Sequence, residues 1–91
     1  MKKIVRTGQF KKDYKKLVRQ GKDIRELKAI VTKLSKGEKL PPQNKDHKLT
    51  GRLEKYRDCH IQSDWILIYQ INKKEQELIL VRMGSHPELF K

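Results

Sequence analysis

The sequence predicts an α+β domain in which a helical hairpin covers one face of a small, mainly antiparallel sheet. Two observations lead to this prediction. Apolar residues recur at helical spacing in the first half of the chain and alternate with a period of two beyond Gly51. The connections within each half are short, which makes consecutive elements antiparallel neighbours. With 91 residues, we expect one domain over 1–91 with a single core.

A short strand and two helices are predicted before Gly37. Lys2–Thr7 alternates weakly and suits a strand. The next segment has a helical apolar stripe, and Gly21 stands where glycine is favoured after a helix C-terminus. Asp23 is the predicted N-cap of the second helix, with Glu26 three residues later completing a capping box. The apolar stripes are Phe10, Tyr14, Leu17 and Val18 in the first helix and Ile24, Leu27, Ile30, Val31 and Leu34 in the second.

Three strands are predicted in the second half, after a proline-containing loop from Glu38 to Leu49. The segments are Leu53–Ile61, Asp64–Asn72 and Gln76–Gly84. Gln62-Ser63 and Lys73-Lys74-Glu75 join them, and such short connections indicate an antiparallel meander. The run from Trp65 to Tyr69 is apolar on both faces, which predicts the central strand. Pro87 stands where a short terminal helical turn begins.

The net charge limits the class of partner. The chain has 23 Lys and Arg against 11 Asp and Glu, a formal charge of +12. Such a charge attracts phosphate backbones through counterion release, whereas a solvated surface or an acidic protein partner is the alternative. Neither helix pairs its lysines with a large aromatic face, so no membrane binding is expected. A single cysteine and no apolar run behind the basic N-terminus predict a cytoplasmic protein without a signal peptide.

Three histidines, His47, His60 and His86, are the candidate chemical groups, and each has polar or charged neighbours. Imidazole titrates between about pH 5 and 8, which suits proton transfer. Strand alternation places His60 on one face with Asp58 and turns Cys59 to the other. Because the helices cover one face, the other is free. If the outer strands of the meander are near neighbours, His60 and His86 meet there, and His47 arches over them.

Such a set of histidines can cut RNA without a metal. Attack by the 2′-hydroxyl needs a base for its proton, an acid for the 5′-oxygen and a cation for the phosphoryl charge. Two imidazoles and the Arg82 guanidinium supply these groups. A hydrogen-bonded structural role is the alternative for each histidine. A shared metal site is disfavoured because Cys59 and His60 point to opposite faces and the spacings match no standard zinc pattern.

Aromatic residues offer a second mode of RNA contact, which is stacking on bases. Trp65, Tyr56 and Tyr69 could stack in this way, but aromatic residues in strands usually belong to the core. Phe90 is different because it is next to the last residue of the chain. It either stacks on a base or packs the tail against the domain.

Three blocks together resemble the YafQ-like branch of the RelE/ParE toxin superfamily. They are KDHKLTG at 45–51, YRDCHIQSDWILIY at 56–69 and RMGSHPELF at 82–90. The resemblance covers essentially the whole chain and implies a RelE-like fold, β-α-α-β-β-β with a short last helix. It also implies a type II toxin that enters the ribosomal A site and cuts mRNA there without a cofactor. The implied partner is an acidic RelB/DinJ-like antitoxin that blocks the toxin.

The resemblance also assigns roles to individual residues. It makes His86 the general acid or base, with His47 and His60 assisting in proton transfer or phosphate binding. Asp58 and Asp64 fall on the active-site acids of the branch. Phe90 falls on the C-terminal aromatic of the branch, whereas Arg82 is a candidate from its own chemistry. The candidate residues for binding RNA or its phosphates are Arg82, Arg57, Lys45 and Phe90.

Two other functions remain open. ParE-type members of the superfamily inhibit DNA gyrase on much the same fold, but they generally lack this histidine set. A basic RNA-binding accessory protein would bind with a steep salt dependence and would neither cleave nor poison. We expect no binding to DNA by the chain itself. Some members of the branch also cut free RNA weakly, so ribosome dependence is a separate question.

Overall fold

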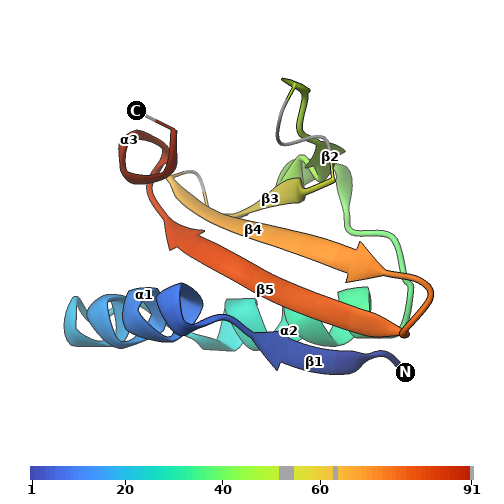
Figure 1. Ribbon diagram of the computed structural model, residues 1–91. Helices are drawn as coiled ribbons and strands as arrows, with labels where there is room; N and C mark the ends of the chain where they lie inside the picture. Colours follow the sequence, from blue (N-terminus) through green and yellow to red (C-terminus); the bar gives the residue numbers. More distant parts are fainter. Residues whose placement is uncertain (52–54, 63, 91) are drawn as a thin grey trace.

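Five strands and three α-helices make up the computed structural model, which describes residues 1–51, 55–62 and 64–90 (Figure 1). The elements are β1 (Lys3–Arg6), α1 (Gly8–Arg19), α2 (Arg25–Ser35), a 3-10 turn (Pro42–Asn44), β2 (His47–Lys48), β3 (Arg57–Gln62), β4 (Trp65–Asn72), β5 (Glu77–Gly84) and α3 (His86–Leu89). The predicted α+β order is therefore confirmed. β2 is an additional short strand within the segment that we expected to be a loop.

The strands lie in the order β1-β5-β4-β3-β2. β3, β4 and β5 form the predicted antiparallel meander with β4 at its centre. β1 pairs with β5 in parallel, from Lys3 opposite Glu77 to Arg6 opposite Leu80. A parallel pair needs a long crossover, and the helices provide it here. β5 continues beyond the end of β1, so the edge from Val81 to Gly84 faces α1 instead of a strand.

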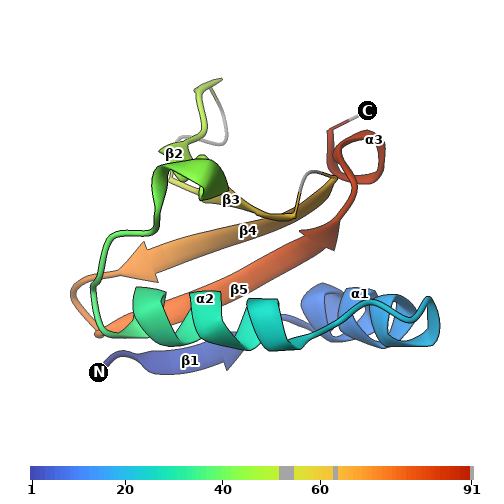
Figure 2. The same ribbon diagram turned by 180° about the vertical axis from the view of Figure 1, so that it is seen from behind.

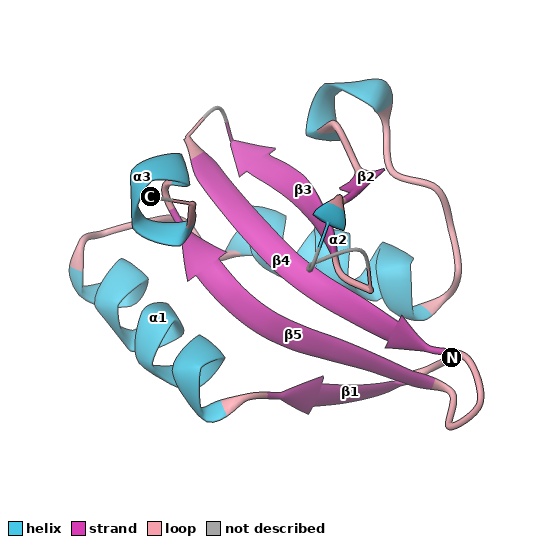
Figure 3. Ribbon diagram, turned by 45° about the horizontal axis from the view of Figure 1, so that its top comes forward, coloured by secondary structure: helices cyan, strands magenta, loops and turns pink. Residues whose placement is uncertain are grey.

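α1 runs beside β5, and α2 passes behind the sheet (Figures 2 and 3). Thr7 begins α1, because its Oγ1 accepts the Phe10 N–H at 3.0 Å and its own hydroxyl donates to the Val81 carbonyl at 2.7 Å. Gly21 follows the helix with φ of +80°, the left-handed conformation that glycine tolerates best. None of the helices in the described residues has the length and apolar character needed to span a bilayer.

The core lies between the helices and the sheet. Leu67 of β4 contributes to it together with Cys59 and Met83, its partners on the two neighbouring strands. The buried members are Phe10, Leu17, Leu27, Ile30, Leu34, Cys59, Ile61, Trp65, Leu67, Tyr69, Leu78, Leu80 and Met83. Trp65 and Tyr69 are therefore core residues. Alternation along β4 turns Ile66 and Ile68 toward the opposite face, which we call the open face.

The predicted capping box of the second helix is wrong. α2 begins at Arg25 with Ile24 as its N-cap, one residue later than expected. Asp23 Oδ1 accepts the Arg25 N–H at 2.9 Å, and the same carboxylate pairs with the Arg25 guanidinium. Side-chain and backbone hydrogen bonds from Arg25 lower the pKa of Asp23 to about 2. Asp23 therefore accepts the backbone N–H of Arg25, the first residue of the helix. A capping box would require it to accept the backbone N–H of Glu26.

The predicted strand boundaries hold within a few residues where the structure describes them. β4 and β5 begin one residue later than expected. β3 begins at Arg57, while part of its predicted start, residues 53 and 54, lies outside the described residues, as does Ser63 of the predicted turn. The register of β3 on β4 shifts between His60 and Gln62, which marks a bulge just before that turn.

Candidate active site on the open face of the sheet

Strand register places two rows of side chains side by side on the open face. In the first row His47 is paired with Asp58, Asp58 with Ile68, and Ile68 with Arg82. Cross-strand partners share a face, so this row joins a predicted histidine, acid and arginine. These residues come from β2, β3, β4 and β5 and are distant in sequence.

The second row brings the other two histidines to the same region. His60 is paired with Ile66, and Ile66 with Gly84. His60 and Gly84 are therefore separated by one strand, about 10 Å at the usual strand spacing. α3 starts two residues after Gly84 with His86, which is exposed. His47 and His60 thus share one face of the sheet, and His86 begins the turn that follows β5 at the end near His60.

Asp58 lies among these histidines. Its side chain is only 5% exposed, and its Oδ1 lies 3.1 Å from Nδ1 of His47. Burial raises the pKa of Asp58 above its ordinary value, whereas the positive potentials of His47, His60 and His86 oppose this shift. Asp58 thus contacts His47, and its row on the open face adjoins the row that contains His60.

A second contact of the His47 ring fixes its tautomer. Nδ1 lies 2.7 Å from the carbonyl oxygen of Lys45. A carbonyl oxygen only accepts, so Nδ1 must carry the proton of that hydrogen bond. In the neutral ring Nε2 is then the unprotonated nitrogen, as a general base requires. Because Nδ1 bonds the carbonyl, Asp58 Oδ1 has no hydrogen-bond partner among the described residues and contributes a charge at close range.

The segment that carries His47 is held by partly buried polar contacts. The Asp46 carboxylate accepts hydrogen bonds from the Tyr69 hydroxyl and from Nε of Arg57, the latter at 3.2 Å. The Asn44 side chain donates to the His60 carbonyl at 2.6 Å. Tyr69 is buried, and burial together with the Asp46 hydrogen bond raises its pKa. These contacts place His47 beside β3 although β2 is only two residues long.

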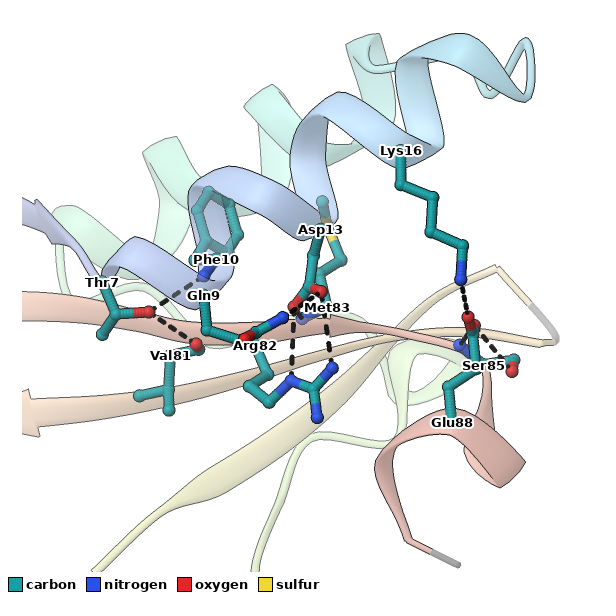
Figure 4. Close-up of polar contacts among 10 residues, drawn as sticks. All are labelled: Thr7, Gln9, Phe10, Asp13, Lys16, Val81, Arg82, Met83, Ser85 and Glu88. Atoms are coloured by element: carbon teal, nitrogen blue, oxygen red, sulfur yellow. Dashed lines mark hydrogen bonds and ion pairs between the residues drawn. The ribbon is translucent and has the colours of Figure 1, made fainter.

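Arg82 is engaged by a carboxylate from α1. Its Nε and Nη2 each lie 3.4 Å from an oxygen of Asp13, and Asp13 Oδ2 also accepts the Met83 N–H at 3.0 Å (Figure 4). The Arg82 side chain remains 37% exposed. Asp13 therefore orients the Arg82 guanidinium, the candidate phosphate-binding group, at the edge of β5 and partly neutralises its charge.

The remaining predicted residues lie around the open face or away from it. His86, the first residue of α3, and Phe90, which follows the helix, stack obliquely, with ring centroids 5.0 Å apart and an angle of 44°. Asp64 and Lys45 are exposed, and their side chains make no hydrogen bond or ion pair with the described residues. Arg57 is opposite Tyr69 on the core side and bonds Asp46, so the sheet does not bring it to the histidines.

The buried thiol does not join the site. Cys59 is fully buried on the core face, and burial raises its pKa to about 12. Within residues 1–51, 55–62 and 64–90, no three His, Cys, Asp or Glu side chains are placed to hold a metal ion together. The open face carries imidazoles, the buried carboxylate of Asp58 and the Arg82 guanidinium.

Comparison with known proteins assigns the chain to a family. The family model described as "Bacterial toxin of type II toxin-antitoxin system, YafQ" matches residues 2–91. The chain belongs to the YafQ toxin family. The resemblance inferred from the three sequence blocks is thereby confirmed.

Relatives of the YafQ family are similar along almost their whole length. The mRNA interferase toxin YafQ of Escherichia coli K12 is 41% identical over 85 residues, which are 92% of this chain and 90% of that protein. The crystal structure of a metal-bound toxin from Helicobacter pylori is 46% identical with a TM-score of 0.94, covering 99% of this chain and 100% of that one. YafQ in the E. coli DinJ–YafQ complex is 38% identical with a TM-score of 0.90, covering both chains fully (100%).

Four residues that support this candidate site were not given a supporting role from the sequence: Asp13, Asp46, Tyr69 and Glu88. Two of them carry a readable signal. Asp13 lies on the apolar stripe of α1 between Phe10 and Leu17, where a charged residue needs a partner. Glu88 stands three residues after Ser85, the spacing of a capping box.

Replacement of Asp58 by asparagine should stabilise this YafQ-family chain at neutral pH. The pKa of Asp58 is raised by burial, so the folded state holds the proton more tightly than the unfolded chain. Ionised Asp58 therefore opposes folding above the raised pKa, and this cost disappears as the pH falls through it. We expect Asp58→Asn to gain about 1 kcal/mol and about 4–8 °C in melting temperature at pH 8.

Thermal melting of Asp58→Asn between pH 3 and pH 8 measures this gain. The exposed Asp64→Asn is the matched control and should melt like the parent chain at every pH. The gain of Asp58→Asn should shrink toward acidic pH. A lower melting temperature at pH 8 would contradict the assignment of Asp58 as a destabilising buried carboxylate.

Proposed function

We propose that the chain is the toxin of a type II toxin–antitoxin pair and cleaves mRNA on the ribosome by metal-independent acid–base catalysis. The observation that carries the proposal is that His47 and His60 lie on one face of the sheet beside buried Asp58, with His86 in the turn that follows β5. The 41% identity to the E. coli mRNA interferase toxin YafQ supports the same substrate class. The charge of +12 supports binding to a polyanion.

The mechanism begins with the 2′-hydroxyl of the nucleotide before the scissile bond. His47 Nε2 accepts its proton, and the resulting oxygen attacks the adjacent phosphorus. The bond from phosphorus to the 5′-oxygen breaks, and His86 gives its proton to that oxygen. The products are a 2′,3′-cyclic phosphate and a free 5′-hydroxyl. DNA has no 2′-hydroxyl and is not a substrate in this mechanism.

The neighbouring residues stabilise the charges that develop on His47 and on the phosphoryl oxygens during the reaction. The imidazolium formed on His47 is stabilised by Asp58, whose oxygen lies 3.1 Å from Nδ1. Arg82 and His60, on the same face, bind the phosphoryl oxygens as negative charge develops on them. Asp64 and Lys45 border the site, while Phe90 stacks on a base or supports the His86 ring.

The proposed partners are the ribosome with its mRNA and an acidic antitoxin. The E. coli relative YafQ was crystallised in complex with DinJ. A DinJ-like antitoxin with many carboxylates would complement the basic surface of this chain. Translating ribosomes are cytoplasmic, so the proposal places the protein in the cytoplasm.

Purified chain should cut mRNA programmed on ribosomes and leave the same RNA intact, or nearly so, when it is free. The ribosome supplies the aligned 2′-hydroxyl that free RNA adopts only briefly. Mapping of 5′ ends should show cuts in phase with codons, and the ends should carry 5′-hydroxyl groups. EDTA added after ribosome assembly, with Mg²⁺ replaced by polyamines, should leave the cleavage rate unchanged.

Three outcomes would contradict parts of this proposal. Equal cutting of free RNA would remove the ribosome dependence. Loss of activity on chelation would indicate a metal. Inhibition of gyrase without RNA cleavage would support the non-catalytic ParE-type function instead.

A further inference from the structure

The α3 turn, which begins at His86 and is followed by Phe90, has little packing of its own. It is four residues long, and none of them is buried. A single helical turn fixes several dihedral angles for few hydrogen bonds and is unstable alone. A polar recess of about 310 Å³, lined by Lys12, Asp13, Lys16, Arg82 and Glu88 among others, lies next to the turn. Something other than apolar burial must therefore orient α3.

The Glu88 carboxylate connects α3 to Ser85, the residue before the helix, and to Lys16 of α1. Glu88 Oε1 accepts hydrogen bonds from the Ser85 N–H at 2.8 Å and from the Ser85 hydroxyl at 2.9 Å. Its second oxygen, Oε2, lies 2.5 Å from Nζ of Lys16 in α1 (Figure 4). Glu88 thus binds the start of its own turn with one oxygen and the first helix with the other.

The backbone at the end of β5 leaves room for this contact. A Cβ at Gly84 would come 3.2 Å from Oε1 of Glu88 and 3.6 Å from Cδ2 of Leu89. Glycine at this position therefore lets the turn fold back over the end of the strand. The hydrogen bonds from Lys16 and Ser85 lower the pKa of Glu88 to about 2. The contact stays charged throughout the pH range in which imidazoles titrate.

We infer that Glu88 and Lys16 are positioning residues that hold His86 over the open face for cleavage. This inference rests on the proposed function for its kinetic consequence only. Neither residue touches the reacting atoms; they act through the orientation of α3. The alternative is that Lys16 is simply one of several lysines that attract RNA.

The first test measures how rigid residues 85–90 are and requires no substrate. Backbone ¹⁵N relaxation of residues 85–90 in the purified chain should show a rigid turn in the parent and a flexible one in Lys16→Glu. Lys16→Arg, which keeps a donor, should remain rigid. Lys15 is an exposed lysine next to Lys16, so Lys15→Glu makes the same charge change. Residues 85–90 should also stay rigid in this variant. Rigid residues 85–90 in Lys16→Glu would overturn the inference, whether or not the chain cleaves RNA.

Cleavage kinetics on programmed ribosomes provide the second test. Lys16→Glu should lower kcat by about 10- to 100-fold, because small misplacement of a reacting group is costly. KM should change no more than in Lys15→Glu. An RNA-attracting role would instead raise KM by a similar factor in both variants and leave kcat unchanged, which contradicts positioning.

Reversal of the pair completes the design. Glu88→Lys places two lysines together and should release the turn. The double variant Lys16→Glu with Glu88→Lys restores the ion pair but not the Ser85 hydrogen bonds. Its residues 85–90 should therefore be more rigid than in either single variant and less rigid than in the parent. A double variant as flexible as the single ones would contradict a direct Lys16–Glu88 interaction.

Discussion

His86→Ala is expected to lower the rate of mRNA cleavage by about 10²–10⁴-fold, the usual contribution of a placed acid or base. The fold should be unaffected because His86 is exposed and α3 buries no side chain. Single-turnover cleavage on programmed ribosomes, with thermal melting beside it, measures both quantities. A catalytic loss with an unchanged melting temperature is the expected pair of results.

Two further variants separate proton transfer from other roles of His86. His86→Gln keeps a polar side chain of similar size, and it should be as inactive as the alanine variant. Phe90→Ala removes the ring that stacks on His86 at 5.0 Å and should retain the acid–base group with a smaller loss of activity. If His86→Gln cleaves at the parent rate, another group transfers the proton.

The fold was predictable because local patterns determined most of its elements. The helical stripe through Phe10 and Leu17 and the alternation along β5 correspond to the observed buried residues. The apolar run from Trp65 to Tyr69 placed β4 at the centre of the meander. These patterns are local, because each is formed by residues close together in sequence. They indicate which side of a helix or strand is buried.

The pairing of distant segments was not predictable from one sequence. β1 lies parallel to β5, and β2 pairs with β3 through only His47 and Lys48. The predicted Gln62-Ser63 connection lacks the glycine or asparagine that determines a tight hairpin. The bulge between His60 and Gln62 appears beside it. Strand register therefore had to come from the structure.

The candidate site was likewise predictable only in part. The histidines and Asp58 were identified by residue type and by resemblance, and the structure shows the register that gathers them. Their supporting partners belong to other segments: Asp46 with Tyr69, and Lys16 with Glu88. Such contacts depend on tertiary placement and leave little trace in local pattern. The failed capping box at Asp23 has a related cause, because Arg25 competes for its carboxylate.

Asp13→Ala is expected to be the most destabilising of these variants. The Asp13 side chain is 9% exposed and accepts the Met83 N–H at 3.0 Å while facing the Arg82 guanidinium. Its removal leaves a buried N–H without an acceptor and an arginine without its partner. Hydrogen bonds to charged groups contribute about 1.5–3 kcal/mol each. We expect a loss of about 2–3 kcal/mol, which is about 10–20 °C in melting temperature for a domain of this size.

Comparison with Asp13→Asn divides this loss between its two causes. The amide oxygen of asparagine still accepts the Met83 N–H but carries no charge for Arg82, so the loss should be smaller. Asp23→Ala, which removes an exposed carboxylate paired with Arg25, is the control and should melt close to the parent temperature, because exposed ion pairs contribute little to stability. Equal melting of Asp13→Ala and the parent would mean that Met83 finds another acceptor.

The same carboxylate links stability to the chemistry of the open face. β5 extends beyond β1, and an unpaired strand edge needs an acceptor for its N–H groups. Asp13 provides it from α1, at the cost of partly neutralising the arginine proposed to bind phosphate. Asp13→Asn should therefore melt at a lower temperature than the parent and yet bind programmed ribosomes more tightly at low salt. A variant that loses both stability and affinity would show that Asp13 serves Arg82 by orienting it, and that its charge does not limit binding.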